Sequence, residues 1–122
     1  MQIDAEYALL TFCDKNVVVV ETKPGIIVEG TMVKKAICMI EEKVDGDFSV
    51  VIDRKNDYKL MRFEIYNETN ACIRLKGVAI VTHSKASEML SDLEAPLCRK
   101  QFAKFHSVEE AIAWAKSLHE VE

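Results

Sequence analysis

The sequence predicts an α/β fold, and three observations support that prediction. Short runs of β-branched and aromatic residues alternate with longer segments whose apolar residues recur at helical spacing. The valine run Val17–Val20 has no polar interruption, which is typical of a strand buried on both faces of a parallel sheet. No apolar run approaches the ~20 residues that a membrane-spanning helix needs. Strands that alternate with helices are expected to be mostly parallel, with right-handed crossovers.

The first half of the chain predicts a hairpin, a helix and a strand. Tyr7–Phe12 and Val17–Val20 are separated by polar residues with turn chemistry, so we expect the two strands to pair antiparallel. A helix is expected from Thr31 to Lys43. Its apolar face would consist of Val33, Ile37, Ile40 and Val44. Phe48–Ile52 follows as a buried strand, and Asp53 stands at its carboxyl end.

The second half predicts three more helices and two more strands. The segment Lys59–Ile73 is weakly helical and has no clean apolar stripe. Val78–Val81 and Gln101–Phe105 are the expected strands. The helix between them would begin after the N-cap Ser84 and pack through one apolar face. That face would consist of Ala86, Met89, Leu90, Leu93 and Leu97. The last helix has a capping-box start at Ser107, with a glutamate three residues later.

These elements predict a single domain over residues 1–122 with the order β-β-α-β-α-β-α-β-α. The expected architecture is a mostly parallel sheet of about five strands, with one antiparallel edge strand and four helices. Only the first strand, which is joined to the second by a tight turn, is expected to run antiparallel.

Composition excludes several classes of function. The net charge of −4 gives no reason to expect nucleic-acid binding. The first residues are acidic where a signal peptide would be basic, so we expect a cytoplasmic protein without stable membrane insertion. The four cysteines form no C-x-x-C pair, and we interpret them as reduced thiols in the core rather than metal ligands. No phosphate-binding or dinucleotide motif is present, so no cofactor is expected.

The carboxyl-terminal part of the chain resembles a known family. Gly77–Thr82, the helix that follows, Ala95–Leu97, Phe105 and Glu109–Trp114 are similar to the SpoIIAA-like group of small bacterial proteins. That group is related to STAS domains (sulfate-transporter and anti-sigma-antagonist domains). The resemblance implies a β-α superhelix with consecutive parallel strands side by side. It also implies a non-enzymatic role as a docking module or a sensor of small ligands, and a distant likeness to lipid-exchange domains of the CRAL-TRIO type is known for the group.

One family feature does not carry over to this chain. The best-known members are switched by phosphorylation of a serine in an Asp-Ser-Ser-Gly-like segment after the third strand. The matching segment here is Asp53–Asp57, which contains no hydroxyl side chain. The phosphorylation switch is therefore not expected in this protein.

The carboxyl ends of the predicted strands supply one set of candidate site residues. Ligands of open parallel sheets bind outside these ends, where Asp53, His83 and Ser84 would lie. Asp53 is either a loop or cap residue or part of a site, and His83 is either a solvated histidine or a pH-sensitive contact. A Ser-His-Asp triad is not expected, because adjacent His83 and Ser84 point in different directions and no G-x-S-x-G elbow is present.

A basic and unevenly apolar segment supplies the second set of candidates. Between Arg54 and Lys76 the chain has six basic and three acidic residues, against a net negative whole. The segment is either a solvated face or a surface for an acidic partner, an anionic ligand or a lipid headgroup. The candidate contacts within it are Arg54, Lys55, Lys59, Arg62, Phe63 and Tyr66.

Two hypotheses of function follow from these candidates. The first is a regulatory or protein-interaction module, expected to form a homodimer through the helix predicted at Lys59–Ile73. The second is binding of a small apolar or anionic, lipid-like ligand between that helix and the sheet. A cavity under Phe63 and Tyr66 would favour the second hypothesis over the first.

Overall fold

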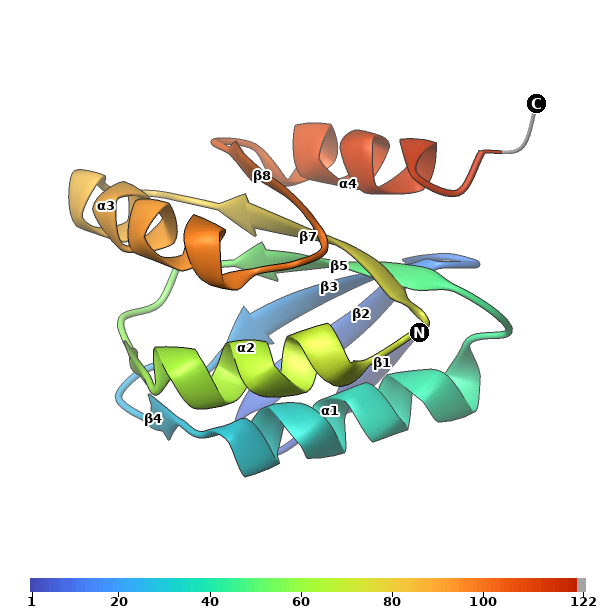
Figure 1. Cartoon of the computed structure of the whole chain (residues 1–122), viewed down its shortest axis with the longest axis horizontal. Coiled ribbons are helices and arrows are strands. Elements are labelled where there is room, and N and C mark those ends of the chain that lie inside the picture. The colour runs from blue at the N-terminus through green and yellow to red at the C-terminus, as the bar shows by residue number, and fades with distance from the viewer. Residues whose placement is uncertain (121–122) are drawn as a thin grey trace.

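The computed structural model describes residues 1–120 and has the expected α/β architecture. The strands are β1 (Gln2–Asp4), β2 (Ala8–Asp14), β3 (Val17–Thr22), β4 (Ile27–Val28), β5 (Phe48–Asp53), β6 (Lys59–Leu60), β7 (Leu75–Val81) and β8 (Gln101–Phe105). The helices are α1 (Gly30–Lys43), α2 (Arg62–Ala71), α3 (Lys85–Glu94) and α4 (Val108–Ser117), with a short 3-10 turn at Ala95–Leu97. Figure 1 shows these elements in place.

The main sheet has six strands in the order β1-β2-β3-β5-β7-β8. β1 pairs antiparallel with β2, and β2 pairs antiparallel with β3. From β3 to β8 every pairing is parallel. Within this sheet, therefore, β2 alone runs against the other strands. The expectation of about five strands with an antiparallel edge strand is wrong in this detail, because β1 covers the outer side of β2 and forms the edge itself.

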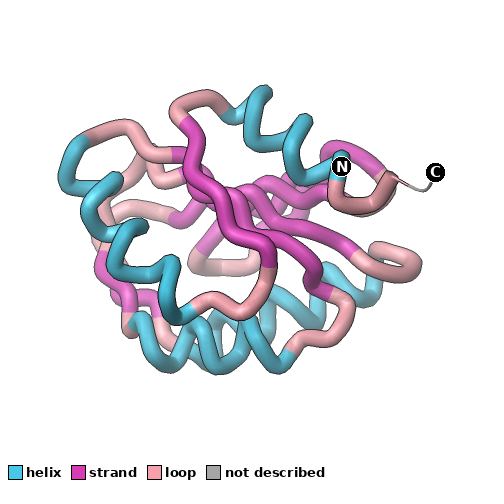
Figure 2. Tube along the Cα trace, turned by 45° about the horizontal axis from the view of Figure 1, so that its top comes forward, coloured by secondary structure: helices cyan, strands magenta, loops and turns pink. Residues whose placement is uncertain are grey.

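The two faces of the sheet are covered by different helices. Helices α1 and α2 lie on one face and α4 on the other (Figures 1 and 2). Even-numbered residues such as Val18, Val50 and Val78 join the core under α1 and α2. Odd-numbered neighbours such as Val17 and Val51 join the core under α4. This alternation explains why the valine run at β3 has no polar position, as expected for a strand buried on both faces.

The segment predicted as the helix Lys59–Ile73 is divided between two elements. Lys59 and Leu60 form the short strand β6, which pairs parallel with β4 in a separate two-stranded sheet. Helix α2 then begins at Arg62 and ends at Ala71. The two-stranded sheet fixes the approach to α2, because the Met61 backbone N–H donates to the Val28 carbonyl at 2.9 Å.

Helix α3 is rotated about its axis, so the face that it buries is not the apolar face predicted from its sequence. The side chains expected to pack inward are exposed at Met89 (68%) and Leu93 (57%). The buried positions of α3 are Ser91 and Glu94. The predicted apolar face of this helix is therefore wrong, and Glu94 is instead directed into the protein.

The free cysteines differ in position. Cys72 is buried and Cys98 half-buried, whereas Cys13 and Cys38 are exposed. The interpretation of all four as core residues is therefore wrong for two of them. Among residues 1–120, no helix is long and apolar enough to cross a membrane.

Candidate functional site

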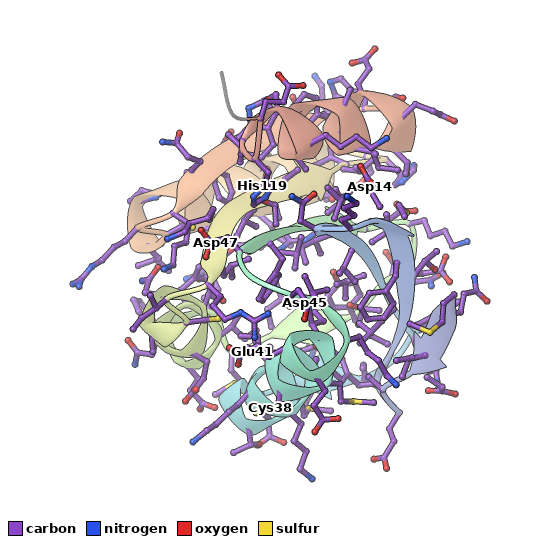
Figure 3. All side chains as sticks on the ribbon, turned by 90° about the vertical axis from the view of Figure 1, so that its right-hand side faces the viewer. Asp14, Cys38, Glu41, Asp45, Asp47 and His119 are labelled. Atoms are coloured by element: carbon purple, nitrogen blue, oxygen red, sulfur yellow. The ribbon has the colours of Figure 1, made fainter. Side chains whose placement is uncertain are left out.

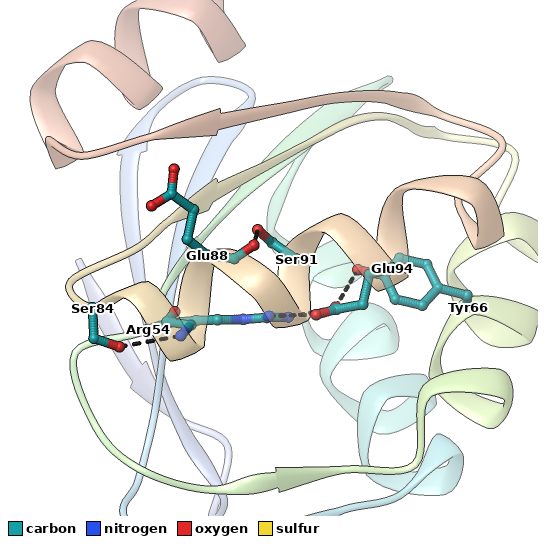
Figure 4. Close-up of polar contacts among 7 residues, drawn as sticks. Arg54, Tyr66, Ser84, Glu88, Ser91 and Glu94 are labelled. Atoms are coloured by element: carbon teal, nitrogen blue, oxygen red, sulfur yellow. Dashed lines mark hydrogen bonds and ion pairs between the residues drawn. The ribbon is translucent and has the colours of Figure 1, made fainter.

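A buried polar cluster joins three elements that are distant in the sequence. Arg54 follows β5, Tyr66 lies in α2, and Glu94 is the last residue of α3. The Arg54 guanidinium forms a two-pronged ion pair with the Glu94 carboxylate, and the Tyr66 hydroxyl donates to Glu94 Oε1 at 2.6 Å (Figure 4). The side chains of Arg54 and Glu94 are 7% and 1% exposed. The cluster therefore sits in the interior, where such hydrogen bonds are strong and unpaired charges are costly.

Local structure explains why each member points inward. The Arg54 backbone N–H donates to the Val81 carbonyl at 3.0 Å, so the chain stays attached to β7 beyond the end of β5. Ser84 caps α3 by accepting from the Ser87 backbone N–H at 3.1 Å, which fixes where that helix begins. The helix buries Ser91 and Glu94, so Glu94 points toward Arg54.

Burial and the ion pair change the ionisation of the cluster. Burial by itself lowers the pKa of Arg54, but the hydrogen bonds and the charge of Glu94 outweigh it, and the net pKa is raised. Burial is also the main reason that the pKa of Tyr66 is raised, and the adjacent Glu94 carboxylate raises it further. Arg54 is consequently charged and Tyr66 neutral throughout the physiological range of pH.

A cavity of about 80 Å³ lies beside this cluster, between the sheet and helices α1 and α2. One end is apolar, with Ile40 of α1 and Leu75 of β7 in its wall. The other end is polar. The polar or ionisable lining residues are Tyr7, Thr22, Arg54, Tyr58, Tyr66, Thr69 and Glu94. The cavity thus combines a mainly hydrocarbon lining with a cluster of hydrogen-bonding groups, which is the usual composition of a small-molecule site.

Two buried polar atoms at the polar end make no hydrogen bond to any described residue. They are Arg54 Nε and the Tyr58 hydroxyl oxygen. Burial raises the pKa of the Tyr58 hydroxyl and outweighs the neighbouring Arg54 and Thr22, which lower it. Neither neighbour forms a hydrogen bond of normal geometry with this hydroxyl. Buried groups of this kind are rare in folded proteins and are usually satisfied by water or by a ligand.

A surface groove of about 100 Å³ lies on the outer side of the same residues. Arg54, Tyr58 and Leu60 line both the groove and the cavity. The far wall of the groove is the first part of α3, including Ser84 and Leu90. These three shared side chains therefore form the partition between the cavity and the surface.

The carboxyl ends of the parallel strands converge, as the sequence predicts. His83 Nε2 lies 2.6 Å from Asp53 Oδ1, which joins the ends of β7 and β5. Thr82 Oγ1 lies 3.5 Å from His106 Nδ1, which joins β7 to the turn after β8. Ser84 takes no part in the His83 contact, because its hydroxyl caps α3. The three residue types of a hydrolytic triad are near one another, but the nucleophile and base are not hydrogen-bonded in the way that chemistry requires.

The remaining predicted contacts are spread over the surface. Lys55 pairs with Glu21 of β3, and Lys59 is exposed on β6. Arg62 is half-buried and Phe63 is 67% exposed at the start of α2. Phe63 does not line the cavity, whereas Tyr66 does. The basic segment is therefore not one continuous positive surface.

Much of the positive charge in that segment is already used within the protein. Arg54 is bound to Glu94, and Arg74 donates to the Glu41, Val44 and Gly46 carbonyls at the end of α1. Lys76 lies 3.9 Å from an Asp47 carboxylate oxygen. Residues that anchor helix ends and loops in this way are poorly placed to bind an acidic partner.

The sequence gives little indication of two members of the site. Glu94 lies in a helix whose apolar residues suggest that it faces solvent, and Tyr58 lies in a polar loop. The one available signal is that Glu94 is three residues from Ser91, so a helix that buries Ser91 also buries Glu94. Its role depends on tertiary contacts that local patterns do not contain.

The opposite end of the sheet has a different character (Figure 3). His119 Nε2 lies 2.7 Å from Ser49 Oγ, and burial lowers the pKa of this histidine. Asp45 and Asp47 lie nearby in a shallow groove that also contains lysines. In the described part of the chain, no group of three histidine, cysteine or acidic side chains is arranged to hold a metal ion.

The fold and site together define an α/β protein with a partly polar cavity between the sheet and helices α1 and α2. Comparison with family models, curated proteins and solved structures gave no match for this chain. The assignment of function therefore depends on the geometry of the cavity and its polar cluster.

Proposed function

We propose that this chain is a non-enzymatic binding protein that takes a small molecule into the cavity between the sheet and helices α1 and α2. The observation behind the proposal is the pair of unsatisfied groups, Arg54 Nε and the Tyr58 hydroxyl, at the end of an otherwise apolar cavity. Leaving one buried donor unpaired costs about 1–3 kcal/mol. A ligand that supplies the missing partner would remove that cost and also bury apolar surface.

The dimensions of the cavity restrict the ligand. Its volume of about 80 Å³ is roughly half of the ~150 Å³ cavity that accommodates benzene. Its lining follows α1 from Val33 to Ile40, a rise of roughly 10 Å at 1.5 Å per residue. A short, narrow, unbranched molecule fits this space better than a ring does, and a longer chain requires α2 to move outward.

The arrangement of strands supports the SpoIIAA-like, STAS-like assignment as part of this proposal. The parallel strands β3, β5, β7 and β8 are consecutive in the parallel part of the sheet, as the resemblance implies. Ligand sensing by such a domain is consistent with the cavity. Loss of the phosphorylatable serine is also consistent, because Arg54 now occupies part of that segment and closes the cavity.

A second candidate function is self-association, and the exposed apolar side chains favour it. Phe63 and Met61 are exposed at the start of α2, and Ile27 is exposed on β4. Ile27 pairs with Lys59 in the two-stranded sheet, and Met61 follows β6 at the start of α2. A homodimer that buries these side chains would be weakened by Phe63→Glu. Sedimentation equilibrium tests this, and a wild-type protein that is monomeric at all concentrations would contradict it.

The ligand proposal is tested by filling the cavity. Ala36 of α1 is buried and lines the cavity, so Ala36→Leu places three further carbon atoms in it. Thermal unfolding is measured with a panel of small alcohols, ketones and esters. A ligand present at 100 times its Kd is expected to stabilise the wild-type protein by about 2.7 kcal/mol and Ala36→Leu not at all.

The matched control is Ala113→Leu, which makes the same change at an exposed position of α4 on the other face of the sheet. This variant is expected to respond to ligand like the wild type. If no compound in the panel stabilises the wild type, or if it stabilises all three proteins equally, the proposal is wrong.

A further inference from the structure

The hydrogen-bonding groups at the polar end of the cavity determine what kind of ligand it can accept. Both terminal nitrogens of Arg54 donate to Glu94, and the Tyr66 hydroxyl proton is donated to the same carboxylate. The groups left without partners are Arg54 Nε–H and the Tyr58 hydroxyl. An arginine N–H can only donate, whereas a tyrosine hydroxyl can donate one proton and can also accept one. Both groups can therefore donate to an oxygen of the ligand, and Arg54 Nε–H can pair with nothing but an acceptor.

The charges at this end are already balanced. One positive charge on Arg54 faces one negative charge on Glu94, and both side chains are at least nine-tenths buried. A carboxylate ligand would place a second negative charge beside Glu94 in the interior. Arg54 is the one basic side chain among the described residues that line the cavity, so no second cation can compensate the charge of such a ligand. Burial of an uncompensated charge is far more costly than burial of a neutral carbonyl group.

We infer that the cavity selects a neutral, unbranched molecule with one hydrogen-bond-accepting oxygen at its end, of the ketone, aldehyde or ester class, over the corresponding carboxylate. This inference rests on the proposed function and specifies its ligand. The oxygen accepts from Arg54 Nε–H and the Tyr58 hydroxyl. The hydrocarbon part extends toward Ile40 and Leu75 at the apolar end.

Three probes of similar length separate the contributions of hydrocarbon, acceptor and charge. Butanone carries a neutral acceptor, butanoate carries the same chain with a negative charge, and butane carries no polar group. Each is titrated at neutral pH into protein with isotope-labelled methyl groups, and NMR shifts of the cavity-lining valines and isoleucines report binding. Butanone is expected to bind at least about tenfold more tightly than butanoate, because only butanoate brings an uncompensated negative charge into the interior.

Two conservative variants test the role of the donors. Tyr58→Phe removes the hydroxyl and keeps the ring in the wall, and Arg54→Lys keeps a cation beside Glu94 but removes Nε–H. Each is expected to weaken butanone binding about two- to tenfold and to leave butane binding unchanged. Tyr58→Phe removes no charge, so it preserves the buried ion pair and keeps the test usable if Arg54→Lys does not fold.

The outcomes separate this inference from the proposed function. If butanoate binds as tightly as butanone, or if Tyr58→Phe leaves butanone binding unchanged, the inferred ligand class is wrong while a ligand-binding cavity stands. If none of the three probes shifts the cavity methyl groups, the space holds only water, and the proposed function itself is wrong.

Discussion

The buried ion pair between Arg54 and Glu94 is the chemical centre of this protein. Glu94 receives the Arg54 guanidinium and the Tyr66 hydroxyl, so its carboxylate joins the end of β5 to α2 and α3. Such a pair adds little net stability compared with apolar residues of the same size, but removal of one partner leaves an uncompensated charge. The pair therefore fixes the position of the cavity wall more than it contributes to the free energy of folding.

Two variants of the cluster test this role of the ion pair. Glu94→Ala leaves Arg54 charged and buried, and it is expected to lower the free energy of unfolding by about 3–5 kcal/mol. Replacement of the whole cluster by Arg54→Met, Glu94→Met and Tyr66→Phe is expected to cost much less, because none of the three positions then carries an unpaired charge or hydroxyl. Urea denaturation measures both proteins. A triple variant less stable than Glu94→Ala would show that the cluster contributes a large net stabilisation.

The three tyrosines predict a specific response to alkaline pH. Burial raises the pKa of Tyr7 to about 12, and the pKa values of Tyr58 and Tyr66 are also raised mainly by burial. In the unfolded chain these groups ionise near pH 10. Since the folded pKa is the higher one, the unfolded chain releases protons first. The contribution of the tyrosines to the free energy of unfolding is therefore complete below about pH 10, and it is lost as the pH rises toward 12.

Ultraviolet absorbance of tyrosinate measures this response. We expect no tyrosine to ionise in the native protein at pH 10, followed by one steep transition that coincides with loss of helical circular dichroism. Gradual ionisation of one tyrosine before unfolding would show that its hydroxyl is open to solvent, and for Tyr58 this would remove a donor from the proposed site.

Helix α3 is the element in which sequence pattern and structure disagree most. Its apolar residues Met89 and Leu93 are exposed, and its buried positions are Ser91 and Glu94. The amphipathic pattern would instead turn Met89 and Leu93 toward the core. The observed rotation is the one that brings Glu94 to Arg54 and Tyr66. Specific polar contacts therefore override the periodicity that usually identifies the buried face.

The orientation of α3 is tested by two substitutions on its opposite sides. Ser91→Leu inserts a large side chain at a fully buried position and is expected to destabilise the protein by about 1–3 kcal/mol. Leu93→Gln changes an exposed position and is expected to have an effect within about 0.5 kcal/mol. Chemical denaturation of each variant gives the comparison. A stable Ser91→Leu variant and an unstable Leu93→Gln variant would mean that the helix packs through its apolar face instead.

Most of the strands and helices could be predicted, because local sequence carries their signals. The strand at Gln101–Phe105 has its predicted bounds, and the helix predicted from Thr31 begins one residue earlier at Gly30. The missed strands are those without a side-chain signal. β1 is polar and is defined by its backbone pairing to β2, and β4 and β6 are too short to show any periodicity.

The arrangement of the whole molecule determines the site, and this is why much of it could not be predicted. The sequence places Asp53 and His83 at neighbouring strand ends, because parallel strands end on the same side of a sheet, and the two side chains do meet. The sequence predicts Tyr66 and Arg54 only as contacts within a basic segment. Their meeting with Glu94 and Tyr58 depends on how α2, α3 and the loop after β5 pack together, as does the cavity beside them.

The proposed ligand, a neutral acceptor, is held in this cavity by Arg54 Nε–H and the Tyr58 hydroxyl. A crystal structure of the protein soaked in butanone tests the claim most directly. We expect one butanone molecule between the sheet and α1, with its oxygen within hydrogen-bonding distance of Arg54 Nε and the Tyr58 hydroxyl. A cavity that contains only ordered water bound to these two atoms, or one closed by movement of Tyr58, would contradict the claim.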